Sequence, residues 1–327
     1  MVFILFFIAA LFTVLAAVKL STYADVLSER TALGGMLIGT LFLAGATSLP
    51  EVTTSLAAIG LNNPDLAVGN VLGSNLFNLL IIASFDLYFR KQQIFKTASK
   101  NHLYTIYLGM LLSFLVFLAL TFKLPYSFFG FGLDSLILIL IYAFGMLLLS
   151  KKVQSFEQHP NDEGVSLTSA ISLKKAIIGF IIASLIILFS GTFLSITGDK
   201  IATITGLGST FVGSFLIAAS TSLPEAVAVL IAIQLRNYNL AIGSILGSNL
   251  FNILILIGSD VFYRQSTILS AVSSVNSITA MAIFVLNLLV LYSLLRIKFT
   301  KLHTVYWLPS AILVVIYFIS SFLIFIY

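Results

Sequence analysis

NPDLAVGNVLGSNLFNLLII, residues 63–82, returns as NYNLAIGSILGSNLFNILIL, residues 237–256, at a constant offset of 174 residues. The same offset relates ATSLPE at residues 46–51 to STSLPE at residues 220–225. It also relates Asp86 to Asp260 and Arg90 to Arg264. A match of this length, in the same order, does not arise by chance. The chain therefore consists of two related halves.

The composition places both halves in a membrane. The chain has 327 residues, of which 59% are hydrophobic and 9% charged, whereas about a quarter of an average soluble protein is charged. Apolar runs of 18 or more residues indicate bilayer-spanning helices. The net charge of +5 reflects loop asymmetry in such a protein, and we expect no nucleic-acid partner. Because the chain has no cysteine, disulfides, thiolate metal sites and thiol redox chemistry are excluded.

Hydropathy predicts an all-α polytopic membrane protein with ten transmembrane helices. The expected limits are 2–18, 33–59, 64–85, 103–122, 127–149, 173–197, 207–234, 238–259, 270–295 and 304–326. The long polar stretch at 151–175 divides the chain. We therefore predict a first five-helix repeat at 1–150, a cytoplasmic linker at 151–172 and a second five-helix repeat at 173–327.

Loop charges orient the predicted helices. The first apolar run has no basic residue before it, and its first positive charge, Lys19, follows the run. That order predicts a retained first span with its N-terminus outside, not a cleaved signal peptide. In this arrangement 14 of the 17 Lys and Arg residues fall in inside loops. We expect a multi-pass protein of the cell membrane, with both termini outside and the central loop in the cytoplasm.

The order of the spans also fixes how the halves are related. Five spans, an odd number, separate equivalent points of the two copies, so the second half must be inverted relative to the first. Inverted repeats are typical of secondary transporters, which bind their substrates near the midplane where the repeats meet. We therefore expect a substrate site between the two copies of the repeated motif.

Each SLPE motif places a proline and a glutamate inside an apolar run. Pro50 has no N–H, so the carbonyl of Ala46 loses its helical partner, and Pro224 does the same to Ser220. Free carbonyls at membrane depth are tolerated only against protein or a water-filled cavity. Glu51 and Glu225 directly follow these breaks, and acids within spans are costly enough to indicate function.

The predicted ion site combines these breaks with the GSNLFN motifs. Hydroxyl, amide and carboxylate oxygens are the ligands that hard cations such as Ca²⁺ and Na⁺ require. Serine and asparagine four residues apart share one helix face in each GSNLFN copy. The glycine before each serine is expected to allow close helix packing. The candidate metal ligands are Glu51, Glu225, Thr47, Ser48, Thr221, Ser222, Asn78, Asn252, Ser74 and Ser248.

Other polar residues favour structural roles. Asp86 and Asp260 each precede an arginine by four residues, a spacing that predicts a local ion pair. Asp134 has no counterpart in the other half and is expected to be a solvated charge at a helix end. The spans contain no nucleophile–base pair and no catalytic metal cluster, so we do not expect an enzyme, and no cofactor other than transported ions is implied. No protein partner can be inferred.

The paired motifs resemble the α-repeats of the sodium/calcium exchanger family, within the wider cation/calcium exchanger superfamily. The resemblance covers nearly the whole chain and is most specific in GATSLPE, GSNLFN and their second copies. It implies that Glu51 and Glu225 are shared between calcium and sodium sites. It also implies hydroxyl and carbonyl ligands at positions 47, 48, 221 and 222, and flanking sodium ligands at Ser74 and Ser248. The first and sixth spans would slide to alternate access.

One position departs from the family pattern. Several members carry an aspartate at the position of Asn252, opposite an asparagine at the position of Asn78, whereas both are asparagine here. An empty site would carry a charge of about −2, which one Ca²⁺, two Na⁺ or two protons would neutralise. The resemblance implies Ca²⁺/Na⁺ antiport, whereas the two asparagines leave Ca²⁺/H⁺ antiport as the alternative. A channel or a scaffold is a distant third, because inverted repeats with symmetric helix breaks argue against both.

Overall fold

A computed structural model describes residues 1–30, 45–99, 102–128, 131–156, 171–296 and 306–327. These residues form an all-α bundle with one short antiparallel hairpin, β1 (Ser127–Phe128) and β2 (Phe131–Gly132). By length and composition, seven of the described helices could cross a membrane, or eight if a bent pair counts as one span. The all-α prediction is confirmed, whereas the count of ten spans remains a prediction.

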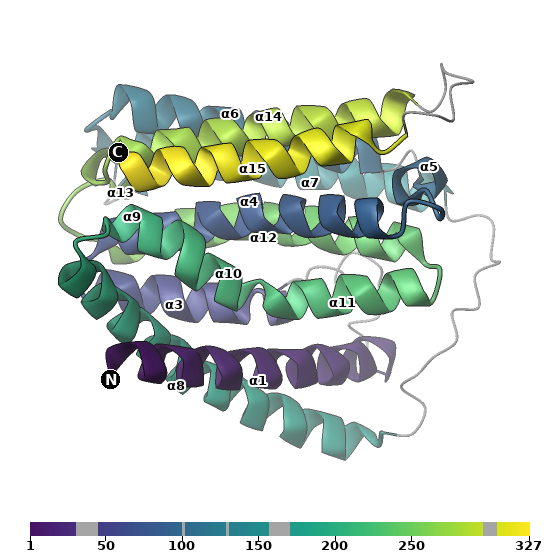
Figure 1. Ribbon diagram of the computed structural model, residues 1–327, viewed down its shortest axis with the longest axis horizontal. Coiled ribbons are helices and arrows are strands. Elements are labelled where there is room, and N and C mark those ends of the chain that lie inside the picture. The colour runs from purple at the N-terminus through teal and green to yellow at the C-terminus, as the bar shows by residue number, and fades with distance from the viewer. Residues whose placement is uncertain (31–44, 100–101, 129–130, 157–170, 297–305) are drawn as a thin grey trace.

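Two long helices form one outer layer of the bundle. They are α1 (Val2–Arg30) and α8 (Leu173–Thr205), which pack against each other at the lower side of Figure 1. Both expose large apolar side chains such as Phe7 and Phe189, as expected of a lipid-facing surface. Both also run past the predicted limits of their spans, 2–18 and 173–197.

A broken layer lies next to this pair. It contains α3 (Leu49–Gly60) and a bent segment made of α9 (Ser209–Phe211), the π-helix η2 (Val212–Ile217), α10 (Ala218–Thr221) and α11 (Leu223–Gln234). The bend between α10 and α11 measures 43°. Residues 33–44 of the predicted span at 33–59 lie outside the described residues, and α3 forms its C-terminal part.

Two helices occupy the centre of the molecule, α4 (Pro64–Tyr88) and α12 (Tyr238–Phe262). Of the 18-residue segment tested in each helix as a membrane span, 89% is buried in α4 and 33% in α1. α4 ends near α5 (Ile94–Thr97) at the right of Figure 1, and α12 ends near α13 (Ile268–Ala271) at the left. The two central helices therefore run in opposite directions, as expected of inverted copies.

The remaining helices cover the far side of this centre. They are α6 (His102–Phe122), α7 (Leu133–Phe156), α14 (Val275–Arg296) and α15 (Leu308–Ile326). Helix α7 begins six residues after the start of the predicted span at 127–149 and continues into the predicted linker at 151–172.

The 174-residue offset reappears in the element boundaries. Shifted by this offset, α3 coincides with α11, α4 with α12 and α5 with α13. Asn63 and Asn237 cap the central helices, and each side-chain oxygen accepts a 3.0 Å bond from the backbone N–H three residues later. The preceding turns use left-handed residues at related positions, Asn62 and Arg236, both with φ 59°. Sequence identity between the halves is thus matched by local backbone geometry.

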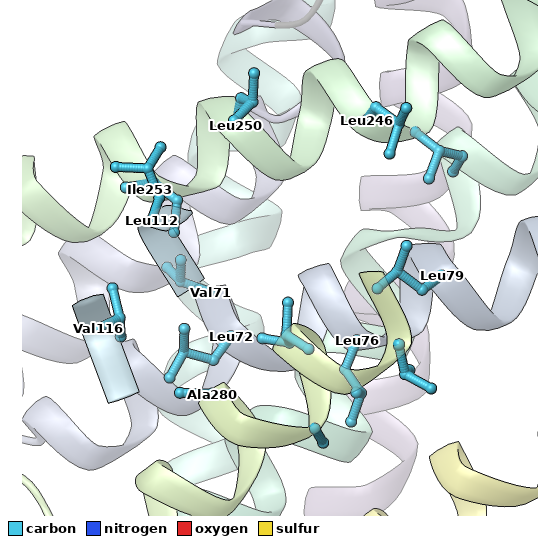
Figure 2. Close-up of a cluster of buried hydrophobic side chains, with 14 of the residues drawn as sticks. Val71, Leu72, Leu76, Leu79, Leu112, Val116, Leu246, Leu250, Ile253 and Ala280 are labelled. Carbon is cyan, nitrogen blue, oxygen red and sulfur yellow. The ribbon is translucent and has the colours of Figure 1, made fainter. Parts of the chain in front are cut away.

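The main apolar core lies between the central helices and the far layer. Figure 2 shows Val71, Leu72, Leu76 and Leu79 of α4 near side chains of α6, α12 and α14. These residues are almost wholly buried. Apolar burial of this kind holds α4 and α12 in place. The polar residues on the other faces of these helices therefore have fixed positions.

Close backbone approach joins α4 to η2. A Cβ atom at Gly69 would lie 2.8 Å from the backbone oxygen of Thr210, and one at Gly73 would clash with the backbone of Ser214. The expected packing role of Gly73 is confirmed. At Gly247, a Cβ would meet no described atom within 4 Å. Its repeat-related neighbour would be Thr40, which lies outside the described residues.

Gly73→Ala should therefore destabilise the protein by about 1–3 kcal/mol, because the added methyl group meets backbone that cannot move aside. The midpoint of thermal unfolding in detergent would measure the effect. Gly60→Ala, at the exposed C-terminal end of α3 where a Cβ would meet no described atom within 4 Å, serves as the control and should leave the midpoint nearly unchanged. Equal midpoints for the two variants would contradict this account of the packing.

Candidate ion-binding site

The two helix breaks have the same backbone geometry. Ser48 has φ −86° and ψ 10°, and Ser222 has φ −90° and ψ 2°; each is followed by a helix with proline in its first two positions. Proline suits this position because its missing N–H would have no helical partner there. The predicted breaks at Pro50 and Pro224 are confirmed.

These breaks place both glutamates in the first turn of a new helix. Glu51 lies in the first turn of α3 and Glu225 in the first turn of α11. The N-terminal end of a helix carries partial positive charge and stabilises an anion. Both side chains are only 1% exposed, and Glu51 Oε1 accepts a hydrogen bond from Ser222, three residues before Glu225. The structure thus brings the two predicted acids together in the interior.

The glutamates have unequal hydrogen-bond partners. Glu51 Oε1 accepts bonds of 3.4 Å from the hydroxyls of Ser74 and Ser222. These donors come from opposite halves of the chain. No described side chain donates to Glu225, and its Oε2 atom has no partner. A hydroxyl–hydroxyl contact of 3.3 Å between Ser74 and Thr221 closes the Glu51 side of the site.

Four asparagines cross-link the central helices in a symmetric pattern. The side-chain amide of Asn75 donates to the backbone oxygen of Asn249 at 3.2 Å, and Asn249 donates back to the backbone of Asn75 at 3.3 Å. Asn78 Nδ2 donates to Asn249 Oδ1, and Asn252 Nδ2 donates to Asn75 Oδ1, both at 2.9 Å. We call these four residues the asparagine bridge. Because the bridge uses the amide nitrogens of Asn78 and Asn252, their oxygens remain available as ligands.

Six buried oxygen atoms of the predicted ligands have no hydrogen-bond partner among the described residues. Buried polar atoms in folded proteins are nearly always paired, so a cluster of exceptions calls for an explanation. Carboxylate, amide and hydroxyl oxygens of this kind are ligands for a hard cation. The atoms are Ser48 Oγ, Glu51 Oε2, Asn78 Oδ1, Glu225 Oε2, Ser248 Oγ and Asn252 Oδ1.

The other four predicted ligands are buried in the same elements. Thr47, Ser74, Thr221 and Ser222 are each at most 4% exposed. Among the described residues, no group of three or more His, Cys, Asp or Glu side chains could hold a metal. Any cation site here therefore depends on two carboxylates supplemented by neutral oxygens.

Sequence reasoning missed a third asparagine on α4. Asn70 Nδ2 donates to Thr54 Oγ1 at 2.7 Å and to Ser55 Oγ at 3.0 Å, while its Oδ1 accepts from Thr221 at 3.4 Å. Asn70 therefore links α3 to the break in the other half. Its repeat-related residue is Ser244, so this link is made on one side only. The difference between the two copies at this position was the signal that could have revealed it.

The ion pair predicted for Asp86 is wrong. Its two oxygens accept bonds of 2.6 Å from the hydroxyls of Tyr306 and Ser310, and Arg90 is exposed. Burial and the adjacent carboxylate raise the pKa of Tyr306 above its ordinary value. The phenol therefore remains a donor, and Asp86 fastens the start of α15 to the end of α4.

The predictions for Asp260 and Asp134 are also wrong. Asp260 accepts from the backbone N–H groups of Gly132 at 2.8 Å and Ile268 at 2.7 Å instead of pairing with Arg264. Asp134 is only 6% exposed and is therefore not a solvated charge. Spacing along a helix indicated an ion pair, but one backbone donor from the hairpin in the first half and one from the start of α13 satisfy Asp260.

Comparison with known proteins identifies the family of this chain. The profile of the family described as "Sodium/calcium exchanger protein" matches residues 1–151 and 175–326. The chain belongs to this family. The putative antiporter CaxA of Alkalimonas amylolytica is 28% identical over 262 residues, which are 79% of this chain and 80% of that protein.

Solved exchanger structures share the fold. An H⁺/Ca²⁺ exchanger CAX matches with a TM-score of 0.69 at 16% identity, over 98% of this chain and 87% of that one. The sodium–calcium exchanger NCX_Mj matches with a TM-score of 0.60 at 20% identity, over 98% of both chains. At these identities, both matches show a shared fold. One of the two matched structures is an H⁺/Ca²⁺ exchanger and the other is a sodium–calcium exchanger.

The glutamates can be tested by cation binding alone. A ligand at a hundred times its dissociation constant stabilises a folded protein by about 2.7 kcal/mol. CaCl₂ should therefore raise the thermal unfolding midpoint of the purified protein. Glu51→Gln and Glu225→Gln should each abolish this increase, because each removes one of two carboxylates. Lys200→Gln, which changes an exposed charge, is the control. A full calcium-dependent shift in either glutamine variant would refute the site assignment.

Proposed function

We propose that the protein is a secondary antiporter that moves Ca²⁺ across the membrane in exchange for Na⁺. The observation that carries this proposal is the set of unpartnered oxygens around two repeat-related carboxylates. These atoms offer a charge of about −2 and neutral oxygens in an interior site, which suits one Ca²⁺ or two smaller monovalent cations. Membership of an exchanger family supports the same reading.

A charge-balanced exchange follows from the two carboxylates. Ca²⁺ neutralises both, and so do two Na⁺ ions. The empty site retains two buried negative charges, which are costly to carry through a closed conformation. Exchange therefore requires that one cation load replaces the other, and uncoupled return of the empty protein is disfavoured.

The α1–α8 pair is the proposed moving part. Small residues line its contact, with Ala16, Ala17 and Ala183 in one buried cluster. Ser195 Oγ on α8 donates to the backbone oxygen of Thr54 on α3 at 2.6 Å. Glu51 lies on the same helix, three residues earlier. Cation binding at Glu51 is therefore positioned to alter how α8 packs on α3, and sliding of this pair would expose the site to alternate sides.

The proposed topology gives the orientation of the protein in the membrane. Ten spans in two inverted repeats, with both termini outside and the linker in the cytoplasm, agree with the opposite courses of α4 and α12 (Figure 1). In this arrangement the end that holds the two termini faces outward.

A second candidate is exchange of Ca²⁺ for protons. The fold is shared with an H⁺/Ca²⁺ exchanger as well as with NCX_Mj. Two carboxylates could also be neutralised by two protons, and neither Asn78 nor Asn252 adds a third acid.

The driving ion can be identified in proteoliposomes. If Na⁺ drives transport, vesicles loaded with Na⁺ should take up Ca²⁺ at fixed pH in the presence of a protonophore. A Na⁺ gradient directed into the vesicles should instead drive Ca²⁺ out of them. Vesicles that contain the Glu225→Gln variant provide the background. Uptake that follows only an imposed pH gradient would replace Na⁺ by H⁺ in the proposal.

Asn252→Asp tests the position that departs from the family pattern. It should change Na⁺ or pH dependence more than maximal Ca²⁺ flux, since a third carboxylate attracts a further cation or takes up a proton. It also removes the Nδ2 donor to Asn75, so Asn78→Asp, which removes the related donor to Asn249, is the matched variant. Unchanged Na⁺ and pH dependence in both would exclude these asparagines from the ion site.

A further inference from the structure

A small cavity with polar and apolar walls lies beside the asparagine bridge. It has a volume of about 10 Å³ and is lined by residues of α4, α6, α12 and α14. Thr105, Gly109 and Ser113 lie four residues apart and form one face of α6. Asn75, Asn249 and Asn287 supply amide groups. Neither glutamate lines this cavity, and none of the ten predicted ligands does.

The bridge leaves hydrogen-bond donors unused at this cavity. A side-chain amide has two N–H groups. Asn75 and Asn249 each donate one bond, to the backbone oxygen of the other. The second N–H of each amide has no partner among the described residues, and both residues line this cavity.

Acceptors lie on the other walls. Ser113 Oγ donates to the backbone oxygen of Met110 at 3.0 Å, so its lone pairs remain available. Asn287 Nδ2 donates to the backbone oxygen of Ile283 at 3.0 Å, which leaves Asn287 Oδ1 as an acceptor. The cavity thus offers two donors and at least two acceptors, with no charged side chain in its lining.

We propose that this cavity binds one water molecule that positions the asparagine bridge. A volume of about 10–15 Å³ accommodates one water, which needs two to four polar partners. Water can accept from both asparagine amides and donate to Ser113 and Asn287. A cation fits poorly, because the two N–H groups point positive charge inward and no carboxylate offsets the loss of hydration.

The water would act on the ion site through the bridge. It holds the amides of Asn75 and Asn249 in one orientation, so that their oxygens face Asn252 Nδ2 and Asn78 Nδ2. That contact in turn leaves the oxygens of Asn252 and Asn78 free for a cation. Residues of α6 and α14 are therefore positioning residues, although they do not belong to the repeated motifs that contain the ligands. This functional consequence rests on the proposed cation transport, whereas the water site itself does not.

The first test is structural. An experimental map of the purified protein at about 2 Å resolution should show a single peak within hydrogen-bond distance of Nδ2 of Asn75 and Asn249. A crystal soaked in Tl⁺, which replaces monovalent cations and scatters anomalously, should show no anomalous signal there. An empty cavity, or a Tl⁺ signal, would overturn the water assignment whether or not the protein transports Ca²⁺.

The second test displaces the water. A Cβ at Gly109 would meet only Leu250 Cδ2, at 3.9 Å, so Gly109→Ala fits without a clash and extends into the cavity. Gly258→Ala on α12, where a Cβ would also meet no described atom within 4 Å, is the matched control. Gly109→Ala should abolish the peak and raise the Ca²⁺ concentration for half-maximal uptake about fivefold, the equivalent of one ordinary hydrogen bond.

Two further variants keep the test decisive if Gly109→Ala does not insert. Ser113→Ala removes an acceptor and should weaken Ca²⁺ uptake in the same way, whereas Thr105→Ser, which keeps the hydroxyl, should not. Unchanged half-saturation in Gly109→Ala and Ser113→Ala, with the peak lost, would overturn the positioning role. Absence of Ca²⁺ uptake by the unmodified protein would refute the proposed function, and the map alone would then decide the water site.

Discussion

The structure depends on one constraint, which is that two carboxylates are buried in the interior of the bundle with no described basic side chain bonded to either. Removing such groups from water is costly unless hydrogen bonds, helix ends or bound cations stabilise them. Each glutamate follows a proline that starts a new helix, so the positive end of that helix lies at the carboxylate. Hydroxyls from both halves supplement this for Glu51. In the function that we propose, a bound cation satisfies the carboxylate oxygens that remain without a partner.

The rest of the bundle keeps that site rigid. α4 and α12 bury most of their surface in the apolar core seen in Figure 2. Gly69 and Gly73 allow η2 to approach α4 at backbone distance. The asparagine bridge then fixes the rotation of the two central helices relative to each other. In the exchange cycle that we propose, movement is confined to the outer pair, α1 and α8, which contacts the centre through small residues and polar contacts such as that of Ser195.

The sequence revealed the parts of this arrangement that obey the repeat. The positions of Glu51 and Glu225, the breaks before them and the two central helices followed from the offset of 174 residues and from the chemistry of proline. Individual hydrogen-bond partners did not follow. Asp86 and Asp260 have the same spacing to arginine, yet one binds hydroxyls of a helix 220 residues away and the other binds backbone N–H groups. Asn70 escaped notice because the repeat replaces it by Ser244. Such contacts depend on which helices become neighbours, and no local pattern encodes that.

The asparagine bridge also constrains biogenesis. Each half orients the proposed ligand asparagine of the other, across 171 residues for Asn78 and 177 for Asn252. When the first half leaves the ribosome, the side chain of Asn75 faces the membrane interior with its partners not yet synthesised. Its polar groups must remain solvated, or be shielded by the insertion machinery, until α12 arrives. Separately produced halves would thus meet as two incomplete sites, and assembly of the pair would coincide with formation of the ion site.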